Sequence, residues 1–296
     1  MSRASFRVEA FAPLRLKSVL VTTHRNTSAE AGDRTGTGFW DEWWRRSPLP
    51  ESIDPCRGGL KNYPYRSFHR FFRRAFQAEP TEGKKLIEVG CAQSVFLPYF
   101  ARHFGFRVLG LDRSEIGCER ARRILEREGV TGPIYCADLF APPAELVCAC
   151  DVAVAFGVLE HFDDTAGALR AVSRFLKPRG RMISWVPNLT GVLGRYQRLL
   201  DPGLYQAHRP LDRESFAQAH KDAGLEVESA DYLMPIGLEV LNVESWKRGL
   251  VRKLVVRAHG LVSRLAWLVD DHCFQLSPNR WTSPYVACVA RKPGAP

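Results

Sequence analysis

The stretch LIEVGCAQS at residues 86–94 combines an acid with small residues in a way that suits a ligand-binding turn. Glu88 lies in an apolar run that predicts a buried strand, and Gly90, Ala92 and Ser94 follow at alternate positions. Small residues after a strand let the backbone approach a ligand closely. A dinucleotide turn needs a third glycine where this chain has Val95, and no G-K-[ST] follows to bind a phosphate. The turn is therefore expected to hold a ligand without phosphates.

Two aspartates stand where later strands are expected to end. Asp112 lies 22 residues beyond Gly90 (112 − 90), and Asp138 ends the next strand. In related folds an acid at about this offset accepts hydrogen bonds from a ribose. The structural alternative is an aspartate that caps the following helix.

Two histidines are candidates for proton transfer. His161 lies in AFGVLEHF (155–162), after a further strand, and His208 lies in the connector segment YQAHRPLD. An imidazole with an ordinary pKa of about 6.5 can accept a proton near neutral pH. A histidine that packs at a helix start, and a surface-loop histidine, are the structural alternatives.

These residues must be positioned by alternating strands and helices. We expect strands at 86–90, 106–112, 133–138, 151–157, 181–187, 225–235 and 285–292, with helices at 61–76, 94–104, 114–129, 163–180 and 212–224. Such alternation predicts an α/β fold with a doubly wound, seven-stranded, mostly parallel sheet. Ligands bind beyond the carboxyl ends of its strands, which is where the candidate residues lie.

The pattern Glu88-x-Gly90-x-Ala92-x-Ser94 resembles the first motif, E-x-G-x-G-x-G, of class I S-adenosylmethionine-dependent methyltransferases. The resemblance covers residues 84–190 and the terminal strand, and it includes the passage LKPRGRMISWVPN (176–188). It implies a Rossmann-like methyltransferase fold with S-adenosylmethionine as cofactor. Two small residues, Ala92 and Ser94, replace glycines of the motif and must fit where backbone usually approaches the ligand.

The resemblance also implies roles for particular residues. Asp112 would accept hydrogen bonds from both ribose hydroxyls, Asp138 would contact the adenine amino group, and 155–162 would line the methyl-transfer pocket. The cofactor-binding set that we expect is Glu88, Gly90, Ala92, Ser94, Asp112, Arg113, Asp138, Leu139, Phe156 and Tyr65. The substrate-binding set is Glu160, Asn188, Tyr205 and Arg209.

The expected reaction is methylation of a small molecule, most simply on oxygen with His161 as general base and His208 as the second candidate. No Asp, His and Asn cluster has metal-ligand spacing, so no metal is expected. Alternative acceptors are a lipid-linked molecule, RNA or protein. A non-catalytic, cofactor-binding relative is a further alternative.

The chain divides into an expected disordered basic arm (1–38), an N-terminal helical cover (39–80) and a methyltransferase domain (81–296). Insertions are expected at about 188–211 and 236–282. The second contains a basic amphipathic segment, 244–269, which could bind a membrane surface peripherally, cap the pocket or form a homodimer. A helix packed on the domain is the simplest reading.

Composition limits the partners and the compartment. The net charge of +10 permits anionic partners, but no zinc-finger, KH-type or RNP-like segment supports nucleic acid. Eight cysteines without C-x-x-C pairs indicate free thiols in a reducing compartment, which predicts a cytoplasmic protein. No apolar run has the length of a membrane-spanning helix.

Overall fold

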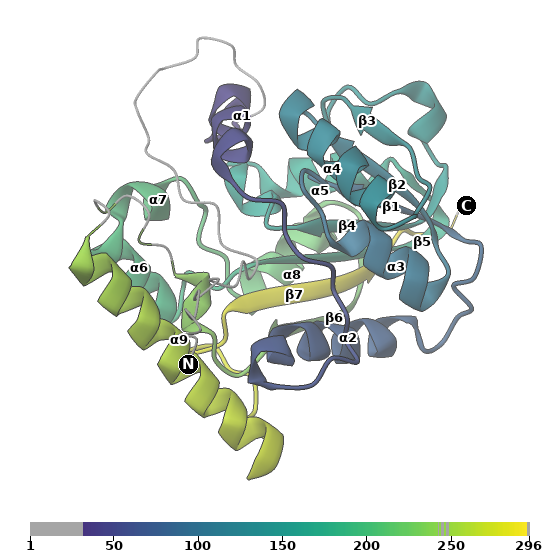
Figure 1. Cartoon of the computed structure of the whole chain (residues 1–296). Coiled ribbons are helices and arrows are strands. Elements are labelled where there is room, and N and C mark those ends of the chain that lie inside the picture. Colours follow the sequence, from purple (N-terminus) through teal and green to yellow (C-terminus); the bar gives the residue numbers. More distant parts are fainter. Residues whose placement is uncertain (1–31, 242, 244–245, 247–248, 295–296) are drawn as a thin grey trace, which may run out of the picture.

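The computed structural model describes residues 32–294 except 242, 244, 245, 247 and 248. Its centre is one seven-stranded sheet with the order β3-β2-β1-β4-β5-β7-β6 (Figure 1). The first five strands run parallel, and β7 runs antiparallel to both β5 and β6. The predicted doubly wound α/β fold is therefore confirmed. Most of the predicted disordered arm, residues 1–31, lies outside the described residues.

The strands lie close to their predicted positions. Their bounds are β1 (Lys85–Val89), β2 (Arg107–Asp112), β3 (Ile134–Cys136), β4 (Cys150–Phe156), β5 (Leu176–Pro187), β6 (Glu226–Leu233) and β7 (Tyr285–Arg291). The inner strands β1 and β4 are almost entirely buried, as expected for a parallel sheet covered on both faces.

Helices cover both faces of the sheet. One face carries α2 (Tyr63–Phe76), α3 (Phe96–Phe104) and α4 (Glu115–Arg127), and the other carries α5 (Thr165–Ser173) and α8 (Arg213–Asp222). The remaining elements are α1 (Thr37–Arg46), α6 (Val192–Leu200), α7 (Pro202–Gln206), α9 (Leu250–His272) and the short 3-10 turns η1 (Leu60–Asn62), η2 (Ala144–Leu146), η3 (Leu159–His161) and η4 (Leu238–Val240). No described helix is both long and apolar enough to cross a bilayer.

Local sequence signals explain the helix boundaries. The Ser114 hydroxyl accepts a hydrogen bond from the Gly117 amide (2.9 Å) and begins α4. Asp212 and Ser215 form a reciprocal capping box at α8. Gly105, with φ +68°, ends α3 in the left-handed conformation that glycine adopts at low cost.

The helix predicted at 163–180 is shorter than expected, because it ends at Ser173. Phe175 and Leu176 are fully buried, and Leu176 already pairs with Cys150 of β4. Pro178 lacks the amide that a helix interior requires, so the helix cannot continue through it. The chain enters β5 instead, and the pairing of β5 with β4 has a register shift near its start. The predicted connector at 188–211 contains α6 and α7, and the later insertion contains η4 and α9.

Buried His220 of α8 makes stability depend on pH. Its Nδ1 donates to the Phe216 carbonyl (2.8 Å), and its Nε2 accepts from the Ser184 hydroxyl (2.9 Å). Burial lowers the pKa of His220 to about 4. The unfolded chain therefore binds more protons than the folded chain as the pH falls below about 6.5, and the free energy of unfolding decreases.

For this histidine we expect a loss of about 2 kcal/mol in the free energy of unfolding between pH 7.5 and pH 5. His220→Gln should lose correspondingly less over the same interval, measured by urea unfolding at both pH values. The exposed His272 provides the matched control, because His272→Gln should keep the wild-type pH dependence. The same pH dependence in His220→Gln and wild type would contradict this account.

Candidate functional site

The turn after β1 depends on a glycine. Gly90 has φ +76°, and a Cβ built on it would lie 2.4 Å from Val158 Cγ2. Its amide donates to the Leu111 carbonyl of β2 (2.8 Å). The positive φ and the close approach to Val158 together favour glycine at this position. The turn lies along the wall of the pocket described below.

The two residues that replace motif glycines are accommodated inside the protein. Ala92 is buried, and a Cβ added at Gly117 of α4 would lie 2.4 Å from the Ala92 methyl. Gly117 thus provides the space that the methyl group needs. The Ser94 hydroxyl donates to the buried Glu88 carboxylate (2.5 Å) and accepts from the Phe96 amide (3.0 Å). Both substitutions are therefore compatible with an intact turn.

The two strand-end aspartates organise the turns around them. Asp112 is 8% exposed, and its carboxylate accepts hydrogen bonds from the amides of Ala92 (3.0 Å) and Ser114 (2.8 Å). Asp138 accepts from the Phe140 amide (2.8 Å). A carboxylate has about four acceptor positions, so each aspartate can fix its turn and still accept hydrogen bonds from a ligand.

Both aspartates line one pocket at the carboxyl ends of the strands. It has about 690 Å³ of space between protein atoms, counting its open mouth. Six of the predicted site residues line it: Gly90, Asp112, Arg113, Asp138, Leu139 and His161. These six residues were recognisable from the sequence alone, and the fold brings them together from the ends of four strands.

Four further residues cover the pocket, and the sequence did not single out any of them as a site residue, although Trp40 and Trp44 lie in the segment 39–80 that it predicts as a helical cover. Asp33, Thr35, Trp40 and Trp44 also line it, and Trp40 and Trp44 pack on Ala92. The Trp40 indole donates to the Thr35 hydroxyl (3.1 Å), and Asp33 forms an ion pair with Arg113. The only sequence signal was the aromatic run FWDEWW at 39–44.

Residues 32–36, which we call the strap, join this cover to the far side of the pocket. The Arg34 amide donates to the His161 carbonyl (3.0 Å). Its guanidinium donates to the carbonyls of Gln206 (3.0 Å) and His208 (3.1 Å). The described end of the predicted 1–38 arm is thus part of the pocket wall.

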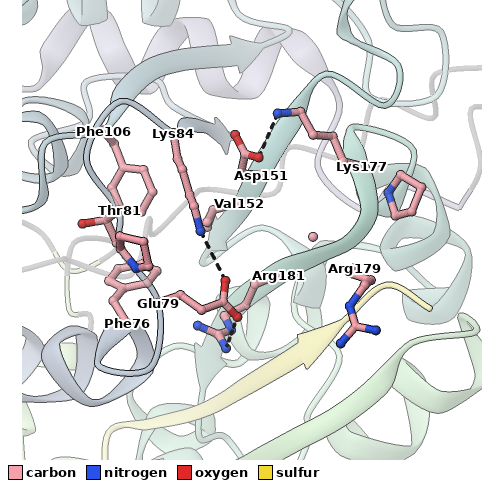
Figure 2. Close-up of a pocket in the computed structure, with 13 residues that line it drawn as sticks. Phe76, Glu79, Thr81, Lys84, Phe106, Asp151, Val152, Lys177, Arg179 and Arg181 are labelled. Atoms are coloured by element: carbon pink, nitrogen blue, oxygen red, sulfur yellow. Dashed lines mark hydrogen bonds and ion pairs between the residues drawn. The ribbon is translucent and has the colours of Figure 1, made fainter. Parts of the chain in front are cut away.

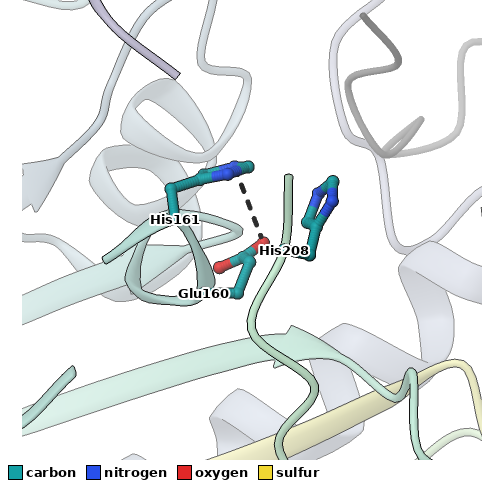
Figure 3. Close-up of side chains that lie close together, drawn as sticks. All are labelled: Glu160, His161 and His208. Atoms are coloured by element: carbon teal, nitrogen blue, oxygen red, sulfur yellow. Dashed lines mark ion pairs between the residues drawn. The ribbon is translucent and has the colours of Figure 1, made fainter. Parts of the chain in front are cut away.

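Glu160 and His208 lie close to His161, which lines the pocket (Figure 3). All three are nearly inaccessible, at 1%, 5% and 2% exposure. His161 Nε2 lies 4.0 Å from Glu160 Oε1, and the two imidazole centroids are 4.7 Å apart. The Trp40 ring meets His161 edge-on at 5.3 Å. The turn η3 and the bend after α7, which are distant in sequence, therefore meet beside a tryptophan of the cover.

Backbone carbonyls indicate the tautomers of both histidines. His161 Nδ1 lies 3.4 Å from the Ala207 carbonyl oxygen, and His208 Nδ1 lies 2.7 Å from that of Leu204. A carbonyl oxygen only accepts, so each Nδ1 carries a hydrogen, and in the neutral form of each ring the lone pair is then on Nε2. A nitrogen with a lone pair can accept a proton or ligate a cation.

Among the described residues, this cluster is also the one group with metal-ligating geometry. Its carboxylate oxygen and imidazole nitrogens lie within 4.8 Å of one another. The sequence predicts no metal, because no ligand set lies near the 155–162 motif and His208 is 47 residues further along the chain than His161 (208 − 161). The absence of a metal stays a prediction.

Several predicted site residues lie away from the pocket. Tyr65 lines a separate apolar pocket with Phe68, Trp267 and Tyr285, and burial raises its pKa to about 12. Phe156 stacks on Trp185 (centroids 3.6 Å) in the aromatic core. These side chains face the layer under α2 instead of the strand ends.

The connector residues have structural contacts. Asn188 donates to the carbonyls of Arg280 (3.1 Å) and Ser283 (3.0 Å), which fixes the start of the β5–α6 segment. Tyr205 is half-buried in α7. The Arg209 amide donates to the Glu160 carbonyl (2.7 Å) and ties the connector to η3. None of the three lines the cofactor-side pocket.

A further pocket of about 480 Å³ lies at the other end of the strands, near the starts of β1, β2 and β4 (Figure 2). Apart from Arg179, its charged residues pair with one another: Lys177 with Asp151 (2.8 Å), and Lys84 and Arg181 with Glu79 (3.3 and 3.4 Å). It collects none of the predicted site residues. The strand-end pocket remains the candidate site.

Comparisons with known proteins identify the same region. A family model described as a methyltransferase domain matches residues 60–230. A ubiquinone biosynthesis O-methyltransferase of Methylocella silvestris is 30% identical over 161 residues, covering 53% of this chain and 62% of that relative. One from Rhodopseudomonas palustris is 23% identical over 203 residues, covering 66% and 78%. The chain thus spans less than two thirds of the length of the Methylocella relative.

Solved structures share the fold at low sequence identity. The [4+2]-cyclase SpnF has a TM-score of 0.56 and 17% identity, covering 88% of this chain and 94% of that one. Geranyl diphosphate C-methyltransferase from Streptomyces coelicolor has a TM-score of 0.56 and 15% identity, covering 85% and 96%. At such identities the likeness concerns the fold, which serves several reactions.

Asp112→Asn tests the expected ribose contact. The amide keeps one acceptor but removes the charge, and hydrogen bonds to a charged group contribute about 1.5–3 kcal/mol each. We expect S-adenosylhomocysteine to bind at least about tenfold more weakly by calorimetry. Asp231→Asn, on β6 and outside the pocket, is the matched control and should bind normally. Unchanged affinity in a folded Asp112→Asn protein would exclude the ribose role.

Proposed function

The chain belongs to the methyltransferase-domain family, and we propose that it transfers a methyl group from S-adenosylmethionine to a hydroxyl oxygen of a small molecule. Residues 60–230 contain the S-adenosylmethionine-dependent methyltransferase domain. The observation that carries the proposed reaction is that Asp112 and His161 line one pocket. A cofactor-binding acid and a candidate base thus face the same space.

The pocket fits the cofactor by its chemistry. Carboxylates at Asp112 and Asp138 suit the hydroxyl and amino donors of an adenosine, and Leu111, Leu139 and Phe140 provide apolar walls for a purine. The Gly90 turn borders the same space. We assign the adenosine to the two aspartates and the methionine end to the turn near Glu88, Ala92 and Ser94.

His161 is the proposed general base. S-adenosylmethionine supplies an electrophilic methyl group on a sulfonium, so the protein must align an acceptor and remove its proton. In the tautomer set by Ala207, the Nε2 lone pair of His161 can take that proton. The buried Glu160 carboxylate at 4.0 Å would stabilise the imidazolium that forms. Trp40 and the strap would exclude water from this end of the pocket.

The names of the Methylocella and Rhodopseudomonas relatives state O-methylation in ubiquinone biosynthesis, which supports an oxygen acceptor. Glu160 and His208 are the proposed acceptor-side groups, with Tyr205 and Arg209 nearby in the chain. A lipid-linked, RNA or protein acceptor remains the alternative substrate, and the cyclase neighbour keeps a non-methylating relative as a second alternative.

Homodimer formation and a cytoplasmic location are further proposals. All eight cysteines are free thiols, and four of them are buried, which suits a reducing compartment. One solved neighbour, from Haloferax volcanii, is a complex between the Trm112 methyltransferase activator and a putative methyltransferase. Membrane contact by the basic segment is argued from α9 below.

His161→Gln tests the base. We expect the turnover number to fall by about 10²- to 10⁴-fold, the usual contribution of a general base. The dissociation constant of S-adenosylhomocysteine should stay within about threefold, because the cofactor-side aspartates are intact. The assay uses labelled methyl donor with a panel of phenols and catechols, and the control is His272→Gln.

Treatment with a chelator distinguishes a role of His161 as general base from a role as metal ligand. As a base, His161 acts without a divalent cation, so EDTA should leave turnover unchanged. Loss of activity with EDTA and recovery with Mg²⁺ or Zn²⁺ would transfer the role to a cation held by the Glu160 cluster. Full activity of His161→Gln would exclude both roles. Methylation on nitrogen or carbon in the product would exclude the oxygen acceptor.

A further inference from the structure

The long helix α9 is held by its polar and aromatic face. Ser263 Oγ accepts from the Leu238 amide (3.0 Å), His259 Nε2 bonds the Tyr196 hydroxyl (3.1 Å), and the Trp267 indole donates to the Ile236 carbonyl (2.8 Å). Trp267 also stacks on Tyr63 of α2 (5.2 Å, 12°). These specific contacts fix the rotation of the helix about its axis.

The opposite face of α9 exposes leucines. Its exposed apolar residues are Leu250 (70%), Val251 (65%), Leu254 (53%), Leu261 (58%), Val262 (44%), Leu265 (55%) and Leu268 (42%), and Val256 (39%) is exposed on another side of the helix. Steps of three, four and seven residues place them on one face. The helix has 23 residues and a length of about 35 Å, and it lies along one edge of the molecule (Figure 1). We call this surface the leucine face.

A leucine face that points to solvent is unusual for a packed helix, which normally buries its apolar side. Here the buried residues are His259, Gly260, Ser263 and Trp267, whereas the leucines are outside. Large exposed apolar patches mark surfaces that bind a partner. The contacts with Ile236, Leu238 and Tyr196 prevent the helix from turning its leucines inward.

Basic residues border this surface. Lys253 and Arg257 are exposed and follow Leu250 and Leu254 by three positions, which places them beside the leucine face. The only acids of α9 are Asp270 and Asp271 at its C-terminus. Asp270 accepts from the Tyr63 hydroxyl (2.6 Å), and Asp271 forms an ion pair with Arg66. The border of the surface is therefore cationic.

We propose that the leucine face of α9 is a docking surface for an anionic lipid bilayer, in which the leucines enter the headgroup region and Lys253 and Arg257 contact lipid phosphates. Apolar residues flanked by lysine and arginine are the pattern of helices that lie in a membrane interface. A second copy fits less well, because the same surface of a partner offers Lys253 and Arg257 no acid other than Asp270 and Asp271, which already contact Tyr63 and Arg66. Docking would hold the enzyme at a surface where amphiphilic acceptors concentrate.

Vesicle co-sedimentation of the full chain tests this surface. We expect binding to phosphatidylcholine vesicles that contain phosphatidylglycerol, little binding to phosphatidylcholine alone, and weakening by salt. The double variant Leu261→Gln/Leu265→Gln should reduce the partition coefficient by at least about tenfold. Leu199→Gln is the matched control, because Leu199 of α6 is 80% exposed outside the leucine face.

Charge is tested separately. Lys253→Glu/Arg257→Glu should lose binding to the anionic vesicles, whereas Arg74→Glu/Lys221→Glu, with the same change in net charge on α2 and α8, should lose much less. Unchanged binding in the α9 variants would assign lipid binding elsewhere in the chain and overturn the proposal, as would no binding by wild type. A dimer that the leucine variant dissociates would overturn it in favour of self-association. None of these readouts depends on methyl transfer.

Discussion

The site depends on the buried carboxylate of Asp112, which joins the two turns that follow β1 and β2 at the pocket. It accepts hydrogen bonds from Ala92 in the turn after β1 and from Ser114 at the start of α4. Ser114 in turn caps α4 and donates to Asp41 of the cover (2.5 Å). A charge held by backbone amides at the end of a central strand is fixed in place. The cofactor pocket is thus built around an acid that the fold already needs.

The other end of the pocket is assembled from segments that are distant in sequence. The strap, η3 and the α7 connector meet through backbone hydrogen bonds, from Arg34 to His161 and from Arg209 to Glu160. These contacts bring Glu160, His161 and His208 together (Figure 3), and the Trp40 ring packs edge-on against His161. A cluster held by backbone is pre-organised, so little is lost in ordering it when an acceptor binds. The same arrangement explains why a short N-terminal segment closes the wall of the site.

The aromatic layer under α2 separates the site from the late insertion. Phe68, Phe156 and Trp185 stack there, and Tyr63 at the start of α2 stacks on Trp267 of α9. Because α9 packs on the domain through Trp267, the leucines of α9 remain exposed to solvent. A helix that the domain holds by polar contacts can therefore present an apolar surface without a loss of core.

The sequence by itself determined the sheet, the alternation of strands and helices, and six of the residues that line the strand-end pocket. Strand periodicity, Gly90, Asp112 and Asp138 are local signals, because a strand that ends in an acid or a glycine turn is visible within ten residues. Only the tertiary structure decided where Tyr65, Phe156 and Asn188 face, that His208 meets Glu160, and that Trp40 covers the pocket. Those outcomes depend on which face of each strand is buried and on contacts across more than forty residues. No single-sequence pattern records such contacts, whereas the backbone geometry of a β–turn–α unit is encoded residue by residue.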